Sequence, residues 1–101
     1  MHGRSVLYLQ PKPGMRQAVI DAFVDEEVPA RALEQDGCLA VELLAPPDEA
    51  APIVVIALWS KREDYDGWLN SPVRAQASGR LDELLTEPPR SEAYDVVISA
   101  P

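Results

Sequence analysis

Residues 52–72 read PIVVIALWSKREDYDGWLNSP, and this stretch decides the fold. Its first part, IVVIALW, is apolar at every position, which is typical of a strand that is buried on both faces. The charged residues that follow end the strand, and Ser60 with Glu63 three positions later has the form of a capping box. The pattern predicts a central strand over residues 52–60 and a helix that begins at Ser60.

The N-terminal half of the chain predicts a strand, a helix and a second strand. Residues 5–10, SVLYLQ, are rich in β-forming side chains and are followed by the turn PKPG. From Met15 the apolar residues recur at spacings of three and four, which predicts an amphipathic helix. Pro29 weakens that helix, and one further turn ends at Gly37. Cys38–Leu44 alternates apolar side chains and predicts the second strand.

The C-terminal half predicts a further helical segment and a last strand. Ser71 and Pro72 are a cap and a first-turn proline, so they restart the helix, which runs to Leu85. Glu92–Ala100, EAYDVVISA, predicts the last strand, with Val96–Ile98 at its centre. The order strand, helix, strand, strand, helix, strand is that of a ferredoxin-like α+β fold, βαββαβ, in which a four-stranded antiparallel sheet carries helices on one face.

Length and the one-sided helix layer indicate the assembly. A chain of 101 residues has the size of one domain, so residues 1–101 are expected to form a single domain. Helices on one face cannot cover both faces of the apolar central strand, and a second copy of the sheet is the simplest cover for the open face. We therefore expect a homodimer whose two sheets pack into a dimeric α/β barrel.

Composition argues against several classes of function. A net charge of −8 with nine scattered Lys and Arg argues against nucleic acid, which requires clustered cations. No apolar run is long enough for a membrane span, and the single Cys38 argues against a disulfide scaffold, so a reduced, cytoplasmic protein is expected. His2 is the only histidine and the glycines never cluster, so we expect neither a metal site nor a nucleotide-type cofactor.

The candidate site lies on the helix that follows the central strand. Trp68 lies four positions after Asp64 and three after Tyr65, so both share one side of that helix with it. Tyr65 and Trp68 would line a pocket, with Asp64 beside them as a candidate general base. The alternative is that the two aromatic residues anchor the core and that Asp64 is an ordinary first-turn acid. For Trp59, at the end of the buried strand, we expect packing in the core.

Other polar side chains are weaker candidates for the same pocket. Asn70 and Arg74 would donate hydrogen bonds to a developing oxyanion, or else they are solvated helix residues. Tyr8 and Tyr94, on two different predicted strands, would contribute hydroxyl groups to the pocket, or else they pack as ordinary aromatic residues.

Several short motifs follow one another in a recognisable frame: PKPG, QDGC, ALWS and EDYDGWLNSPVRAQ. In this frame the chain resembles, over nearly its whole length, the antibiotic biosynthesis monooxygenase domain of the dimeric α/β-barrel superfamily. Members of that family include cofactor-independent oxygenases that convert anthrones, naphthols or quinols to quinones, and relatives that degrade haem. The resemblance implies a monooxygenase that oxidises an aromatic polyketide-like or quinol substrate with O2 and without a cofactor.

The resemblance also implies roles for individual residues. Trp68 matches the helix tryptophan implicated in such sites and would orient the oxygenated intermediate. Asp64 stands where the quinone-forming members carry asparagine, and would assist deprotonation. Tyr65, Tyr8 and Arg74 would shape or polarise the pocket.

Two other functions occur for this fold or remain compatible with the sequence. Haem degraders carry an asparagine on the first strand and a histidine on the following helix, and the corresponding positions here are Leu7 and Ser78, so haem cleavage is not expected. A non-catalytic dimeric module stays open as an alternative. It would bind an aromatic metabolite, or serve as a structural partner in a biosynthetic pathway, without consuming O2.

Overall fold

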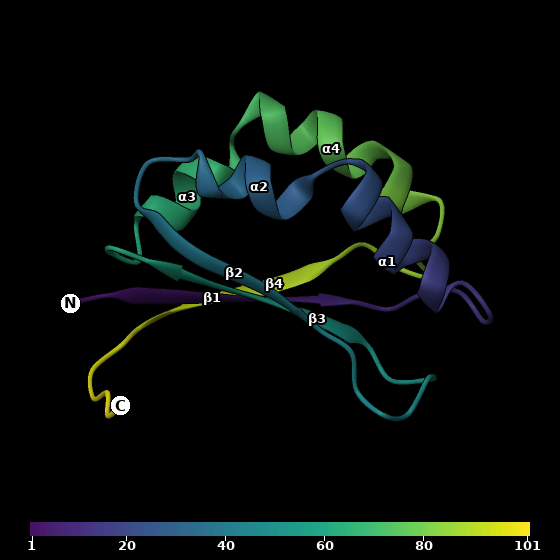
Figure 1. Ribbon diagram of the computed structural model, residues 1–101, viewed down its shortest axis with the longest axis horizontal. Helices are drawn as coiled ribbons and strands as arrows, with labels where there is room; N and C mark the ends of the chain where they lie inside the picture. Colours follow the sequence, from purple (N-terminus) through teal and green to yellow (C-terminus); the bar gives the residue numbers. More distant parts are fainter.

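A four-stranded antiparallel sheet with all helices on one face forms the fold (Figure 1). The computed structural model describes residues 1–101, apart from the side chain of Ser78. The sheet order is β2-β3-β1-β4, and the strands are β1 (Gly3–Leu9), β2 (Cys38–Leu44), β3 (Ile53–Trp59) and β4 (Arg90–Asp95). The helices are α1 (Arg16–Asp25), α2 (Val28–Leu33), α3 (Asp64–Leu69) and α4 (Pro72–Asp82). The predicted ferredoxin-like α+β fold is confirmed.

Alternate residues of the central strand β1 face the helices. Gly3, Ser5 and Leu9 are buried on that side. Ser5 lies opposite Ala57 on β3 and opposite Ala93 on β4. Three adjacent strands therefore place small side chains in one row beneath the helices.

The helix-facing side chains form two hydrophobic clusters. The first lies where α1 and the end of α4 cover the sheet, and its buried members are Leu9, Val19, Ala22, Phe23, Ile53, Leu81 and Leu85. The second lies beneath α2 and α3, and its buried members are Ala32, Ala57, Trp59, Tyr65 and Trp68. Val28, at the start of α2, packs against both clusters. Helix α4 lies farthest from the sheet and packs on α1 and α2 (Figure 1).

The predicted first helix is divided into α1 and α2. The break falls at Glu27, whose φ of 53° is in the left-handed region. Pro29 lies in the first turn of α2, where a missing backbone N–H costs nothing because that group would have no helical partner. The proline therefore helps to start a second helix instead of ending the first one.

The two predicted helix caps have different outcomes. Ser71 caps α4, because its hydroxyl accepts a hydrogen bond from the backbone N–H of Val73 at 3.2 Å, as predicted. The capping box predicted at Ser60 and Glu63 is wrong. Helix α3 begins at Asp64, Glu63 makes no side-chain cap bond, and the Ser60 hydroxyl instead donates to the Asp64 carboxylate at 2.6 Å.

The last strand is shorter than predicted at its C-terminal end. It spans Arg90–Asp95, and Asp95 pairs with Gly3, where β1 itself begins. The Val96 backbone N–H still donates to the His2 carbonyl at 2.8 Å, but no further residue of β1 remains to extend the ladder. The following segment leaves the sheet on the side away from the helices (Figure 1), with Val97 and Ile98 76% and 89% exposed.

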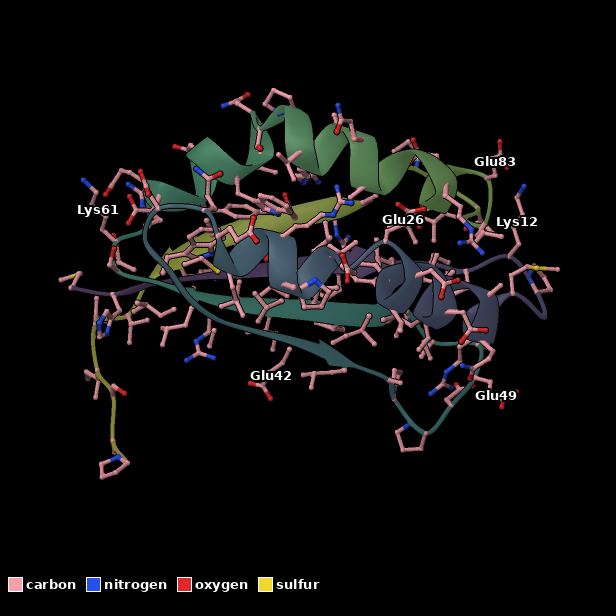
Figure 2. All side chains as sticks on the ribbon, turned by 45° about the horizontal axis from the view of Figure 1, so that its top comes forward. Lys12, Glu26, Glu42, Glu49, Lys61 and Glu83 are labelled. Atoms are coloured by element: carbon pink, nitrogen blue, oxygen red, sulfur yellow. The ribbon has the colours of Figure 1, made fainter. Side chains whose placement is uncertain are left out.

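The other face of the sheet carries no helix. Alternation along the strands directs apolar side chains of β1 and β3 to this face, namely Val6, Tyr8, Val54, Ile56 and Leu58. Charged residues lie on the neighbouring edge strands, and Figure 2 shows Glu42 of β2 pointing away from the helix layer. Among the described residues, no helix is long and apolar enough to cross a membrane.

Candidate functional site

A cavity of about 60 Å³ lies between the sheet and the helices. Its floor includes Ser5 and Ala57, and its roof includes Ala32 of α2 and Ala77 of α4. Small side chains above and below therefore leave a slot between the two hydrophobic clusters. The remaining walls are mostly apolar.

The size of the slot limits what it can hold without rearrangement. A water molecule needs roughly 10–15 Å³ measured in this way, whereas pockets for drug-sized ligands have about 300–1,000 Å³. The 60 Å³ cavity can therefore hold a few waters, but a fused-ring aromatic ligand requires that its walls move. Helix α4 supplies Arg74, Ala77 and Leu81 to these walls and does not belong to the sheet layer, so its displacement would enlarge the slot.

Three aromatic residues form one end of the slot. Helix α3 presents Tyr65 and Trp68 to the sheet, since residues three positions apart share one helix face. Tyr65 packs on Trp59 with ring centroids 5.7 Å apart and an interplanar angle of 53°. All three side chains line the slot, so Trp59 is both a core residue and part of the cavity wall.

The polar atoms of these aromatic residues differ in their partners. The Trp59 indole N–H donates to the Ser5 hydroxyl oxygen at 2.9 Å in a buried hydrogen bond. Within the described part of the chain, neither the Tyr65 hydroxyl nor the Trp68 indole N–H has a hydrogen-bond partner. No buried side-chain nitrogen or oxygen of the described residues is unsatisfied, so the Tyr65 hydroxyl and the Trp68 indole nitrogen each keep some accessible surface.

Arg74 brings a positive charge to the slot. It lies near the start of α4, is half-buried and lines the cavity. Among the side chains that the structure describes, none forms an ion pair or hydrogen bond with its guanidinium group. A cation without a partner beside an apolar cavity favours a ligand that carries negative charge.

Asp64 lies outside the slot, at the junction between α3 and the turn before β2. Its carboxylate accepts from Ser60 and rests against Gly37, where a methyl group would overlap it. The Ser60 backbone N–H also donates to the Gly37 carbonyl at 2.8 Å. Asp64 therefore fixes the start of α3, which in turn positions Tyr65 and Trp68.

The structure does not bring Tyr8 or Asn70 to the slot. Tyr8 points to the open face of the sheet, where the Arg90 guanidinium lies 4.8 Å from its ring centroid. Tyr94 lies on the same face and donates its hydroxyl to Glu92. Asn70 ends α3, and its side-chain amide donates to the Asp66 carbonyl at 2.9 Å. Of the seven candidates, Tyr65, Trp68 and Arg74 line the cavity.

Two polar residues of the slot were absent from the sequence-based candidates. Ser5 shares its strand face with Leu7 and Leu9, so its position among inward-facing apolar residues was a usable signal. Asp82, an exposed residue at the end of α4, lines the slot as well. Nothing in the sequence distinguishes Asp82 from the other acidic residues of exposed helix surfaces.

The described side chains provide no group for a metal. No set of three or more His, Cys, Asp or Glu among them could hold an ion. Cys38 packs against the cluster beneath α2 and α3, and burial raises the pKa of its thiol. At the two positions that correspond to the haem-degrader ligands, Leu7 lines the slot as an apolar residue, whereas the side chain of Ser78 lies outside the described part.

Comparison with known proteins identifies the family. Residues 4–80 match the family described as antibiotic biosynthesis monooxygenase, and the chain belongs to this family. Comparison with the curated proteins finds no match.

Solved structures with the same fold agree with this assignment. A mutant of SnoaB from Streptomyces nogalater, described as a cofactor-independent oxygenase, has a TM-score of 0.80 at 19% identity, and the match covers 99% of this chain and 97% of that one. The Rv0793 protein of Mycobacterium tuberculosis has a TM-score of 0.77 at 22% identity, with full coverage of both chains. A conserved protein of Methanosarcina mazei has a TM-score of 0.78 at 17% identity, covering 94% and 92%. These similarities concern the fold.

Proposed function

We propose that the protein is a cofactor-independent monooxygenase that oxidises an aromatic polyketide-like or quinol substrate to a quinone with O2. Family membership supports an oxygenase, and one structural neighbour is described as a cofactor-independent oxygenase. The observation that carries the proposal is the slot itself. It is mostly apolar, has aromatic walls, and is lined by Arg74 and Trp68, whose guanidinium group and indole N–H have no partner among the described residues.

The reaction balances without an external reductant. An anthrone methylene loses its two hydrogens and gains one oxygen atom, or a phenolic ring loses one ring C–H hydrogen and one hydroxyl hydrogen while that ring carbon gains the oxygen; in both cases the second atom of O2 leaves as water. The substrate supplies all the electrons, first as an anion formed by loss of a proton and then through a peroxide that eliminates water. The protein has to stabilise the anion, exclude bulk water and donate hydrogen bonds to the peroxide.

The polar residues in and beside the slot have different roles in this reaction. Arg74 stabilises the substrate anion by its charge. Trp68 donates its indole N–H to the oxygenated intermediate, and Tyr65 donates its hydroxyl to a substrate oxygen. Asp64 is assigned a positioning role through α3, because its carboxylate is bonded to Ser60 outside the slot. Asp82 is the candidate proton acceptor, because it is the only carboxylate among the described residues that line the cavity.

The proposed assembly is a homodimer formed by the open faces of two sheets. The apolar row of β1 and β3 needs cover, and a second copy offers the same apolar surface. Arg90 and Glu92 on β4, with Glu42 on β2, give this face charges of both signs at its edges. Such an arrangement is suited to a self-complementary contact.

A non-catalytic binding module is the second candidate. It is favoured by one observation: Asp82 is the only carboxylate among the described residues that line the slot, and it is exposed. A ligand-binding protein needs no base.

O2 consumption separates the two candidates. Anthrones and dihydroxynaphthalenes would be supplied to the purified protein while O2 uptake and quinone formation are recorded. The oxygenase predicts quinone formation that falls at least tenfold in Trp68→Phe, since loss of one oxyanion donor costs roughly 100-fold or more. Saturable binding of the same compounds without O2 uptake supports the binding module instead.

A further inference from the structure

Ser5 lies on the floor of the slot between two alanines. Its neighbours across the sheet are Ala57 on β3 and Ala93 on β4, so no large side chain rises beside it. On the same face the adjacent rows carry the larger side chains of Trp59 on one side and of Leu7 and Val55 on the other, although Gly3 and Ser91 in those rows are small. The sheet therefore has a shallow trough at Ser5, and the roof of the same slot also carries small side chains.

The Ser5 hydroxyl is the polar group on this floor, and only part of its hydrogen-bonding capacity is used. It is 3% exposed, and is the one buried polar side chain among the described residues. A hydroxyl has one proton to donate and two lone pairs to accept with. The Trp59 N–H occupies one lone pair at 2.9 Å, and no described side chain accepts the proton.

This arrangement favours donation into the slot. The indole N–H fixes the hydroxyl oxygen and polarises it, because a group that accepts a hydrogen bond becomes a better donor. The Ser5 oxygen already has one partner, but its proton has no acceptor among the described side chains, so a ligand oxygen placed above the trough would gain a hydrogen bond. The slot also offers donors on its walls in Tyr65, Trp68 and Arg74. Its polar groups are therefore matched to a ligand rich in acceptors.

We propose that Ser5 binds the substrate directly, by donating its hydroxyl proton to a carbonyl or hydroxyl oxygen of a planar aromatic ring system that lies in the trough. Trp59 acts as a positioning residue, which holds the Ser5 hydroxyl in the orientation that leaves its proton free. Ser5 thereby selects aromatic compounds that carry oxygen over hydrocarbons of the same shape. The ligand class rests on the proposed function.

A pair of probes that differ in one oxygen tests this selection. Binding of 2-naphthol and of naphthalene to the full-length protein is measured by titration calorimetry under argon, so that no oxidation takes place. The wild-type protein is expected to prefer 2-naphthol. In Ser5→Ala the affinity for 2-naphthol should fall roughly tenfold, while that for naphthalene changes less than about twofold, because only one ligand hydrogen bond is lost.

Matched variants separate binding from folding. Ser91→Ala removes an exposed serine of β4 and should leave both affinities unchanged. Ser5→Ala leaves the Trp59 N–H without an acceptor, which can prevent folding. In that case the double variant Ser5→Ala with Trp59→Phe, which removes both hydrogen-bond partners, is used instead of the single variant. The ratio of the two affinities is then read from the double variant.

The outcomes are distinct. Equal losses for both probes, or an unchanged ratio in the Ser5 variants, overturn the role of Ser5. A wild-type protein that binds neither probe overturns it together with the aromatic ligand class. A Ser5-dependent preference for 2-naphthol in a protein that consumes no O2 with any oxidisable substrate upholds the inference and overturns the oxygenase proposal alone.

Discussion

The carboxylate of Asp64 rests against Gly37, so that a methyl group at position 37 would overlap it. Gly37 also has a φ of 85°, in the left-handed region that favours glycine. This contact joins the turn before β2 to the first residue of α3. It holds the helix that carries two of the aromatic walls of the slot.

The first prediction concerns this contact. Gly37→Ala should lower the free energy of unfolding by about 2 kcal/mol or more, from backbone strain together with the overlap. Gly14→Ala is the matched control, because Gly14 has a φ of 77° but no atom within 4 Å of an added methyl group. It should cost only about 1 kcal/mol. Urea unfolding measures the free energy of unfolding of both variants, and equal losses would show that the contact with Asp64 does not contribute to the cost of Gly37→Ala.

The second prediction separates a positioning role for Asp64 from a role as base. Asp64→Asn retains an oxygen that accepts from Ser60, so stability and O2 uptake should both change little. If Asp64 were the general base, uptake would fall roughly 100-fold or more with unchanged folding. Initial rates with a dihydroxynaphthalene decide between them, and Ser60→Ala provides the comparison in which only the hydrogen bond is lost.

The third prediction concerns the unpaired cation. Arg74→Gln should weaken binding of an ionised aromatic ligand about tenfold or more, because a hydrogen bond to a charged group contributes roughly 1.5–3 kcal/mol. It should not reduce stability, since Arg74 has no ion-pair partner among the described residues. Arg80→Gln, on the same helix, removes an exposed pair with Asp25 at 3.2 Å and should leave ligand binding unchanged. Equal binding by both variants would contradict the role of Arg74.

The fourth prediction concerns the open face. Ile56→Asp places a charge at the centre of the apolar face and should convert the proposed dimer into a monomer of 11.1 kDa. Leu33→Asp, at an exposed position of α2 on the helix side, should leave the proposed dimer intact. Sedimentation equilibrium at micromolar concentration measures both. A wild-type protein that sediments as a monomer would rule out the two-sheet assembly.

The fifth prediction follows from the raised pKa of Cys38. Burial favours the neutral thiol, so at pH 8–9 alkylation of the folded protein by iodoacetamide should be slower than that of the urea-unfolded chain. Because the pKa of the Cys38 thiol is higher in the folded state than in the unfolded chain, its contribution to the free energy of unfolding is fully present below the unfolded pKa, near 9.0. That contribution is lost as the pH rises through the folded pKa. Identical alkylation rates in the two states would contradict this.

Local signals in the sequence predicted most of the elements. The bounds of the strand Cys38–Leu44 and the Ser71 cap agree with the structure because alternation and capping depend on neighbouring residues, although a bulge between Cys38 and Ala40 interrupts the alternation at Leu39, which is exposed. The end of β4 was missed, because a strand stops where its partner stops, and Asp95 faces the first residue of β1. β-forming side chains at Val97 and Ile98 do not reveal this.

The site was predictable in part for the same reason. Helical spacing placed Tyr65 and Trp68 on one face, and both line the slot. The same spacing did not separate Asp64 from them, because its position depends on the distant Gly37. The sequence could have placed Tyr8 outside the pocket. Tyr8 lies three residues after Ser5 along β1, and side chains an odd number of positions apart in a strand point to opposite faces of the sheet.

The most direct test of the account is the fate of isotopically labelled O2 in a reaction with an anthrone, followed by mass spectrometry of the quinone. The proposed mechanism predicts one labelled oxygen atom in each quinone formed, one O2 consumed per quinone, and at least a tenfold lower rate for Trp68→Phe. A quinone without label, or a rate equal to that of the anthrone in buffer alone, would contradict the proposal that this slot carries out an oxygenation.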